Sequence, residues 1–377
     1  MKNLNLNRFA LTICGFVLVQ LVFWIVLQFF GYYLGNVDNW LRYDSWHYLA
    51  ILENGYELFP CPENVDLTSP NITWCGNTGW FYGLPLLCKP LVYLFGHPKW
   101  VMTIVVNIFS LLSAFWILKL ADVKKINLHS ILFTLLVCFY WSFFYQHAVF
   151  PVSATVFFML LAIDAYLKHQ FYLVLLACLL ASFFYPTGFL LGGALAILAL
   201  IAHRNNFKKA IKPVLLYTLF GFGGMLTFFV MLYFEVGDFM GFIKVQAKYG
   251  HGLHNPLLLI NHAIHTLFKT ENPKDYFIII QSFSILFYFG FLTVVFFKNK
   301  MFRTPLFLVV YAISMLYLVF PWVIGGEQLS LYRAEALLLP SVLLLKDASI
   351  RVKLTVLAML LAIGLPMCYL YVDGFLV

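Results

Sequence analysis

Long, almost uncharged apolar stretches dominate this sequence. They cover residues 9–34, 101–120, 171–202, 214–234, 277–297, 306–320 and 354–372. A hydrocarbon layer about 30 Å thick is crossed by about 20 residues of α-helix, and a helix satisfies its own backbone polar groups in lipid. With shorter apolar runs counted, we expect an all-α polytopic membrane protein with roughly eleven crossings. The first run is longer than a signal-peptide core and lacks a small-residue cleavage site, so we expect it to be retained as a helix.

The placement of charge indicates a topology. The net charge is +8, which would suit a nucleic-acid ligand, but the basic residues lie in short connectors between apolar runs. These residues are Lys2, Arg8, Lys119, Lys124, Lys125, Lys168, Arg204, Lys208, Lys209, Lys212, Lys298, Lys300, Arg303, Lys346, Arg351 and Lys353. Connectors rich in Lys and Arg stay in the cytoplasm. We therefore expect no nucleic-acid partner, and we place the loops that carry Asp44 and Glu327 outside.

The chain is expected to form one membrane domain over residues 1–377, because no soluble segment separates the apolar runs. Two external loops, 36–98 and 235–276, are much longer than the other connectors, and long ordered loops tend to be functional. Within the first loop, residues 40–56 have helical spacing and end in Asn54-Gly55, a common helix stop. Its aromatic residues suit a helix that lies at the membrane interface.

Cys61 and Cys75 both fall in the first external loop. An oxidising compartment would let them form a disulfide, with a stabilisation of about 3 kcal/mol in the chain-entropy model. The alternative is a pair of free thiols. We predict the disulfide, which would brace the segment around Asp44.

The segment "RYDSWHYLAILENGY", residues 42–56, places ionisable residues among aromatic ones. On a helix Asp44, His47 and Tyr48 share one face, which suits a general base with its orienting partners. Arg42 and Glu53 would point elsewhere, toward lipid headgroups or helix caps. The alternative is a solvated interfacial helix with no chemical role. Charged groups wedged among large aromatic side chains at a membrane are costly unless paired, which favours function.

The same segment resembles the signature of the GPI mannosyltransferase II family and its prokaryotic relatives, through Arg42, Asp44, His47, Glu53 and Gly55. Further elements follow in the family's order along the chain: "WFYGLPLL" (80–87), "ASFFYPTGFLL" (181–191), "VQAKYGH" (245–251) and "LSLYRAEALLLP" (329–340). Tyr185 stands where the family often has arginine. The resemblance implies a GT-C-type glycosyltransferase with extracytoplasmic loop helices.

That resemblance implies transfer of a hexose, most simply mannose, from a polyprenyl-phosphate carrier to a hydroxyl of a glycan, glycolipid or protein. The expected reaction is an inverting single displacement without a cofactor. Asp44 is the expected catalytic base. The substrate-binding residues expected beside it are Arg42, His47, Gln246, Lys248, Tyr249, His251 and Arg333. Arg333 can hold a phosphate with two parallel hydrogen bonds.

We expect no metal, because the histidines of the second external loop lack a carboxylate or cysteine that completes a site. The competing function is a lipid-linked-sugar flippase or small-solute transporter, and a third is a structural subunit of a glycan-assembly complex. Transporters usually carry ionisable residues at mid-membrane, whereas most acids here fall in external loops. The expected location is a bacterial or archaeal cell membrane, or the endoplasmic reticulum membrane in a eukaryote.

Overall fold

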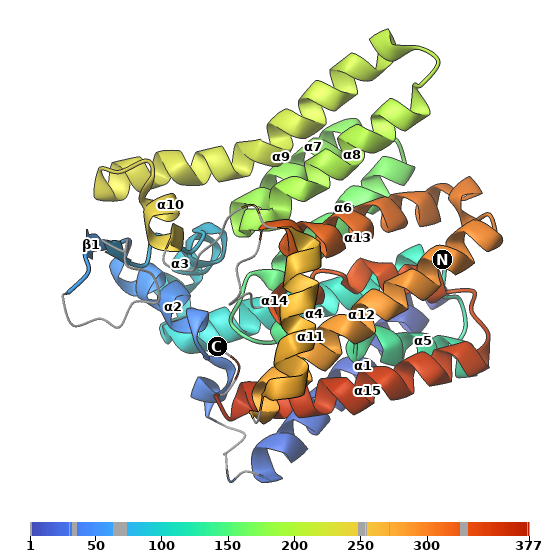
Figure 1. Cartoon of the computed structure of the whole chain (residues 1–377), viewed down its shortest axis with the longest axis horizontal. Coiled ribbons are helices and arrows are strands. Elements are labelled where there is room, and N and C mark those ends of the chain that lie inside the picture. Colours follow the sequence, from blue (N-terminus) through green and yellow to red (C-terminus); the bar gives the residue numbers. More distant parts are fainter. Residues whose placement is uncertain are drawn as a thin grey trace.

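The fold is almost entirely helical (Figure 1). The computed structural model describes residues 2–29, 31, 36–62, 74–247, 253, 255–270, 272–324, 331–374 and 376. The N-terminus lies at the end of the helices opposite to α2 (Asp44–Asn54), and the C-terminus lies beside α2. The first and last helices therefore both point their C-terminal ends toward the α2 side.

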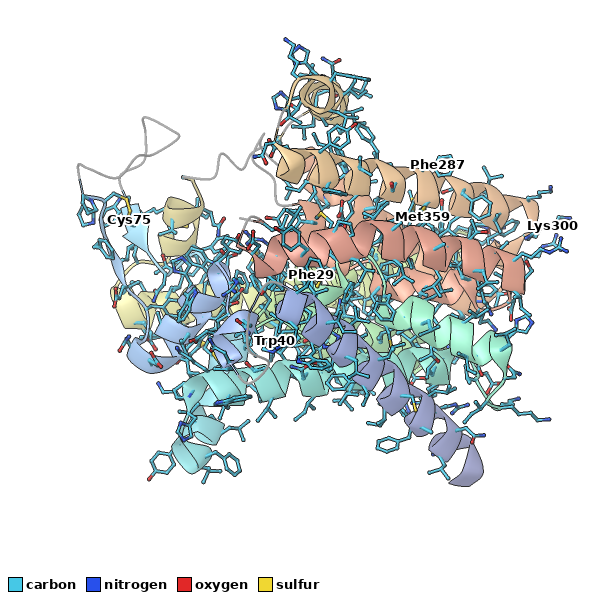
Figure 2. All side chains as sticks on the ribbon, turned by 90° about the horizontal axis from the view of Figure 1, so that it is seen from below. Phe29, Trp40, Cys75, Phe287, Lys300 and Met359 are labelled. Carbon is cyan, nitrogen blue, oxygen red and sulfur yellow. A yellow bond between two sulfur atoms is a disulfide. The ribbon has the colours of Figure 1, made fainter. Side chains whose placement is uncertain are left out.

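Six helices in the described part of the chain are long and apolar enough to cross a membrane. They are α1 (Lys2–Phe29), α4 (Pro98–Leu120), α9 (Phe207–Val236), α12 (Pro273–Lys298), α13 (Pro305–Ile324) and α15 (Ile350–Val372). Figure 2 shows several of them side by side, with many apolar side chains pointing outward. The expected all-α membrane protein is confirmed at this level, and the first apolar run is a helix.

Shorter helical elements accompany the long helices. They are α5 (Leu128–Cys138), α6 (Val152–Leu167), α7 (Phe171–Phe184), α8 (Phe189–Ala202) and α14 (Leu331–Ala336), with the 3-10 turns η2 (Phe143–Gln146), η3 (Pro186–Gly188), η5 (Met301–Arg303) and η6 (Leu339–Leu345). Most of α6 is buried, and every residue of η6 is buried. Of these short elements, α6 and η6 therefore lie in the interior of the helical body.

Close backbone contact joins α8 to α9. A Cβ added at Gly192 would stand 2.3 Å from the carbonyl oxygen of Tyr217 and 2.8 Å from Cα of Gly221, whereas one added at Gly193 would meet nothing within 4 Å. Small residues let apolar helices approach this closely. The crossing of α8 and α9 thus depends on glycine at residue 192.

The first external loop folds into short elements. These are η1 (Val37–Trp40), α2, the strands β1 (Leu58–Pro60) and β2 (Trp74–Gly76), and α3 (Gly83–Phe95). The strands pair antiparallel, with Phe59 opposite Cys75. The helix expected from residue 40 begins at Asp44 instead, because Leu41 is extended and Tyr43 has a positive φ of 51°. Its predicted end is right: Gly55, with φ 83°, follows the last helical residue.

The second external loop contributes two helices, α10 (Gly241–Gln246) and α11 (Pro256–Lys269). No residue of α11 is buried, and its apolar side chains include Leu257 and Phe268, which are 71% and 83% exposed. A helix with this pattern suits a membrane interface better than water.

Charged residues assigned to the cytoplasm meet at the end of the bundle far from α2. The carboxylate of Asp164 pairs with Lys119 at 2.9 Å and with Lys168 at 2.8 Å, and Arg8 reaches Asp122 at 3.2 Å. Three separate basic connectors thus lie at one end, as a common cytoplasmic side requires.

Candidate active site

The start of α2 presents Asp44 at its first helical position. Tyr43 precedes it with φ 51° and ψ −114°, a backbone conformation that costs a non-glycine residue about 1–3 kcal/mol. A carboxylate in the first turn interacts favourably with the positive end of the helix dipole. The fold therefore places the carboxylate of Asp44 directly after the strained backbone of Tyr43.

The carboxylate of Asp44 forms an ion pair with Arg333, whose Nη1 donates to Asp44 Oδ2. The two residues are 289 positions apart in the sequence, on α2 and α14. Their side chains are 20% and 18% exposed, so the pair is largely shielded from solvent while remaining reachable. The structure brings together the residues that sequence analysis chose as base and as phosphate ligand.

Aromatic side chains surround this pair. The guanidinium carbon of Arg333 lies 5.8 Å from the ring centre of Phe150, and Tyr145 stacks on Tyr332 at 5.8 Å between ring centres. Tyr185, which follows α7, lies within electrostatic reach of both charges. Burial alone would lower the pKa of Arg333, but the charge of Asp44 and the nearby phenols raise it well above its usual value. Arg333 is therefore a fixed positive charge in an apolar wall.

Several polar atoms near the pair are buried without a hydrogen-bond partner among the residues that the structure describes. They include Nε of Arg333 and the phenol oxygens of Tyr43 and Tyr145. A buried polar group left unpaired costs about 1–3 kcal/mol, so such atoms are uncommon in a finished core. Donors of this kind suit a ligand rich in hydroxyl or phosphate oxygens.

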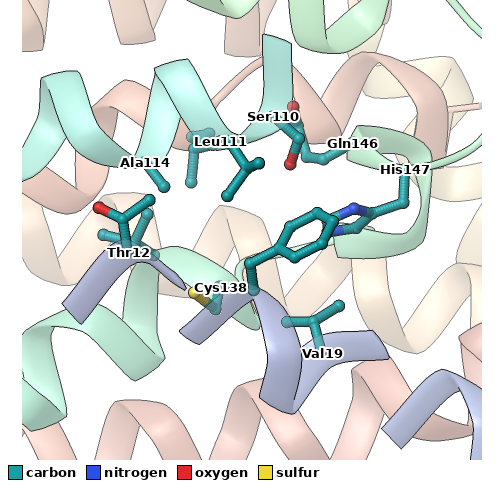
Figure 3. Close-up of a pocket in the computed structure, with 11 residues that line it drawn as sticks. Thr12, Val19, Ser110, Leu111, Ala114, Cys138, Gln146 and His147 are labelled. Atoms are coloured by element: carbon teal, nitrogen blue, oxygen red, sulfur yellow. The ribbon is translucent and has the colours of Figure 1, made fainter. Parts of the chain in front are cut away.

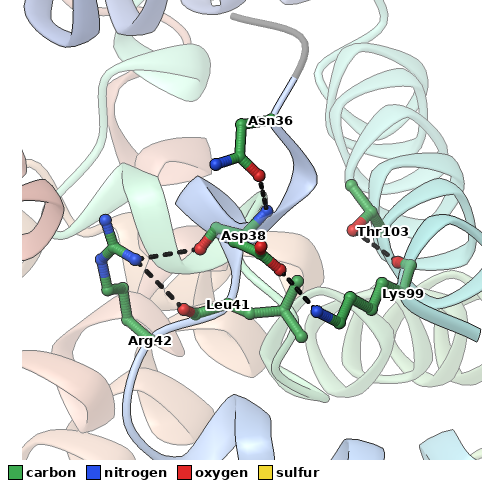
Figure 4. Close-up of polar contacts among 6 residues, drawn as sticks. All are labelled: Asn36, Asp38, Leu41, Arg42, Lys99 and Thr103. Atoms are coloured by element: carbon green, nitrogen blue, oxygen red, sulfur yellow. Dashed lines mark hydrogen bonds and ion pairs between the residues drawn. The ribbon is translucent and has the colours of Figure 1, made fainter. Parts of the chain in front are cut away.

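Arg42 and Asp38 have other surroundings (Figure 4). Arg42 donates from Nη2 to the carbonyl of Val372 at 2.9 Å and from Nη1 to the carbonyl of Asp38 at 2.9 Å. The carboxylate of Asp38 pairs with Lys99 at 2.8 Å, away from the Asp44–Arg333 pair. These contacts give Arg42 a structural role in joining the end of α15 to the turn before α2, and its expected part in substrate binding stays a prediction.

Of the other residues expected to bind substrate, two have contacts that the structure describes. His47 stacks on Trp80, with 3.5 Å between ring centres. Gln246 donates to the carbonyl of Gly79 at 2.8 Å, which ties α10 to the segment before α3. The remaining three, Lys248, Tyr249 and His251, lie outside the described residues.

A second buried polar group, Glu335, received no role from the sequence. Its Oε1 accepts from Ser282 at 2.8 Å, and its Oε2 accepts from Nε2 of Gln281, which also donates to Ser142 at 2.7 Å. Glu335 is only 6% exposed. The available signal was a lone carboxylate directly ahead of the apolar run 336–339.

A small cavity lies between α1, α4 and α5, with the His147 side chain on its wall (Figure 3). Its volume is about 20 Å³, which suits about one water molecule. His147 hydrogen-bonds to Asn107 at 2.9 Å. This cavity is too small for a sugar or a lipid chain.

The disulfide expected between Cys61 and Cys75 is present in the structure, and Cys75 lies on β2. The disulfide links two positions of the first external loop that follow α2 in the sequence. Within the described residues, no group of three or more His, Cys, Asp or Glu is arranged to hold a metal ion. The expectation of a reaction without metal stays a prediction.

Comparison of the sequence with family models and with curated proteins found no relative. No family model matches the sequence, and no curated protein matches it significantly.

Proposed function

We propose that this chain is a GT-C-type membrane glycosyltransferase of the kind implied by the resemblance to GPI mannosyltransferase II. It would move a hexose, most simply mannose, from a polyprenyl-phosphate carrier to an acceptor hydroxyl on the extracytoplasmic face. We also propose that the chain crosses the membrane roughly eleven times, with shorter helices crossing beside the six long ones. The observation that carries it is the ion pair of Asp44 and Arg333, which unites two segments that the resemblance had singled out separately.

The chemistry needs one base and one cation. The acceptor oxygen attacks the anomeric carbon, its proton passes to Asp44, and the bond from the anomeric carbon to the phosphate oxygen breaks with its electron pair. The leaving phosphate gains negative charge during this step. Arg333 therefore binds it more strongly in the transition state than in the ground state, which is the condition for catalysis.

The ion pair also suggests an order of events. The donor phosphate competes with Asp44 for the guanidinium of Arg333, and Nε of Arg333 has a donor hydrogen to offer. When the phosphate takes Arg333, Asp44 is released to accept a proton from the acceptor. Donor binding would thus prepare the base.

A matched pair of variants tests this proposal. Purified protein in liposomes is supplied with polyprenyl-phosphate mannose and a soluble acceptor, and transfer is measured as the labelled product. Asp44→Asn keeps size but removes the base, so transfer should fall by about 100-fold or more. Asp38→Asn changes a carboxylate that is 43% exposed and paired with Lys99, and it should retain most of the activity. Equal effects of the two substitutions would refute the assignment.

A transporter remains the second candidate, because Glu335 is a carboxyl buried in the helical body. Buried ionisable groups often mark transport pathways. The same liposomes separate the two functions: movement of lipid-linked sugar across the bilayer without any transferred product would favour the transporter.

A further inference from the structure

Polar contacts join the short helix α14 to three other elements, α2, α12 and η2. Arg333 reaches Asp44 on α2, and Glu335 binds Ser282 and Gln281 on α12. In addition, Gln146 of η2 donates to the carbonyl of Ala336 at 2.8 Å. A helix of six residues has little rigidity of its own. The direction of the Arg333 side chain is therefore set by these contacts.

The surroundings of Glu335 offer no opposite charge among the described residues. α13 contains no Asp, Glu, Lys, Arg or His, and those of α12 (Lys274, Asp275, Lys298) lie at its ends. Tyr140, which precedes η2, interacts electrostatically with Glu335 and with Tyr288 of α12. On α14 itself, Arg333 is taken by Asp44.

A carboxylate buried without a cation costs several kcal/mol, so such a group holds its proton. Burial raises the pKa of Glu335 to about 7, against the opposing effect of the hydrogen bonds from Gln281 and Ser282. The 2.8 Å contact to Ser282 also fits a proton on Oε1, since a hydroxyl oxygen accepts as well as donates.

We propose that Glu335 is a positioning residue that acts as a neutral carboxylic acid, clamping α14 to α12 so that Arg333 faces Asp44 and the donor phosphate. This role rests on the proposed function. Ionisation of Glu335 would place a second negative charge two residues from Arg333. This charge would be buried without a cation, which destabilises the packed position of α14, and it would oppose the approach of a phosphate.

The sign of the pH effect follows from the raised pKa. The native state holds the Glu335 proton more tightly than the unfolded chain, whose glutamates titrate near pH 4.3. Stability from this group is complete below that value and declines as pH rises toward about 7. Transfer depends on the protonated fraction of native Glu335, so it should be nearly constant up to about pH 6 and fall about tenfold for each pH unit above about 7.

Two substitutions test the positioning role through the pH profile of transfer. Glu335→Gln keeps the shape of a neutral acid, so it should retain most of the activity at about pH 6 and lose the decline above pH 7. Glu335→Leu removes both hydrogen bonds and should reduce kcat by about 10-fold or more at every pH. Glu53→Gln, at an exposed position of α2, serves as the control and should leave the wild-type profile unchanged. A Glu335→Gln enzyme that keeps the wild-type decline would overturn the proposal.

A spectroscopic measurement does not depend on transfer and so separates this proposal from the proposed function. Infrared spectra of the full chain in nanodiscs at about pH 6 should contain the C=O stretch of a neutral carboxylic acid. Isotope labelling of glutamate should shift this band, Glu335→Gln should remove it, and Glu53→Gln should leave it. Absence of the band in the wild type would refute a neutral Glu335 even if the enzyme transfers sugar. Its presence in a protein without transferase activity would support the neutral clamp and reject only the enzymatic function.

Discussion

Neutralising both members of the Asp44–Arg333 pair separates stability from chemistry. Removing one partner of a fully buried ion pair costs about 3–5 kcal/mol, because the other charge is left uncompensated. This pair is about one fifth exposed, so a smaller loss of about 3 kcal/mol is expected for Asp44→Asn. Arg333→Gln leaves Asp44 at the start of α2, where the helix dipole contributes about 0.3–1 kcal/mol, so its loss should be nearer 2 kcal/mol.

The double variant Asp44→Asn/Arg333→Gln leaves no isolated charge and allows an amide–amide hydrogen bond. Its stability should therefore be no worse than that of either single variant, which corresponds to a coupling energy of about 3 kcal/mol or more. Transfer should behave differently. Each single variant should lose about 100-fold or more, and the double variant should recover nothing, because both the base and the phosphate ligand are gone.

Unfolding can be followed with a thiol-reactive fluorophore on the purified membrane protein. Cys88, Cys178 and Cys368 are buried in the folded chain and become reactive only on unfolding. Recovery of sugar transfer in the double variant would refute the chemical role and leave a purely structural ion pair. Additive stability losses would instead refute the contact between the two side chains.

Two further predictions concern the scaffold. Reduction of the Cys61–Cys75 disulfide, or Cys75→Ser, should lower the free energy of unfolding by about 3 kcal/mol, and an unreduced digest of the wild type should contain the linked peptides in mass spectra. Two free thiols in the native protein would contradict this. Gly192→Ala should destabilise the protein by about 1–3 kcal/mol, because its Cβ would stand 2.3 Å from the carbonyl oxygen of Tyr217. Gly193→Ala, with nothing within 4 Å, should stay within about 0.5 kcal/mol of the wild type, and equal thermal shifts would refute the close helix crossing.

Local patterns predicted much of the fold. Apolar runs predicted the long helices, and Asn54-Gly55 predicted the end of α2, because chain length and glycine conformation act over a few residues. The beginning of α2 was missed, since tyrosine rarely adopts the positive φ that residue 43 has. Short buried elements such as η6 carry no distinctive period and depend on their neighbours.

The candidate site was predicted in its residue types but not in its contacts. Asp44 and Arg333 were each selected from their own segment, but no local rule pairs residues 289 positions apart. Glu335 was overlooked because a single carboxylate in an external connector is usually solvated, and only the packing of α12 against α14 shows that this one is buried.

The link from Arg42 to the carbonyl of Val372 has a consequence for biosynthesis. The turn before α2 leaves the ribosome among the first segments of the chain, whereas α14 and the end of α15 leave among the last. Until then Asp44 lacks Arg333, and Arg42 lacks the carbonyl of Val372. The first external loop must therefore stay without these contacts while the later helices enter the membrane. A ribosome stalled before residue 331 should leave that loop sensitive to protease, and release of the full chain should protect it.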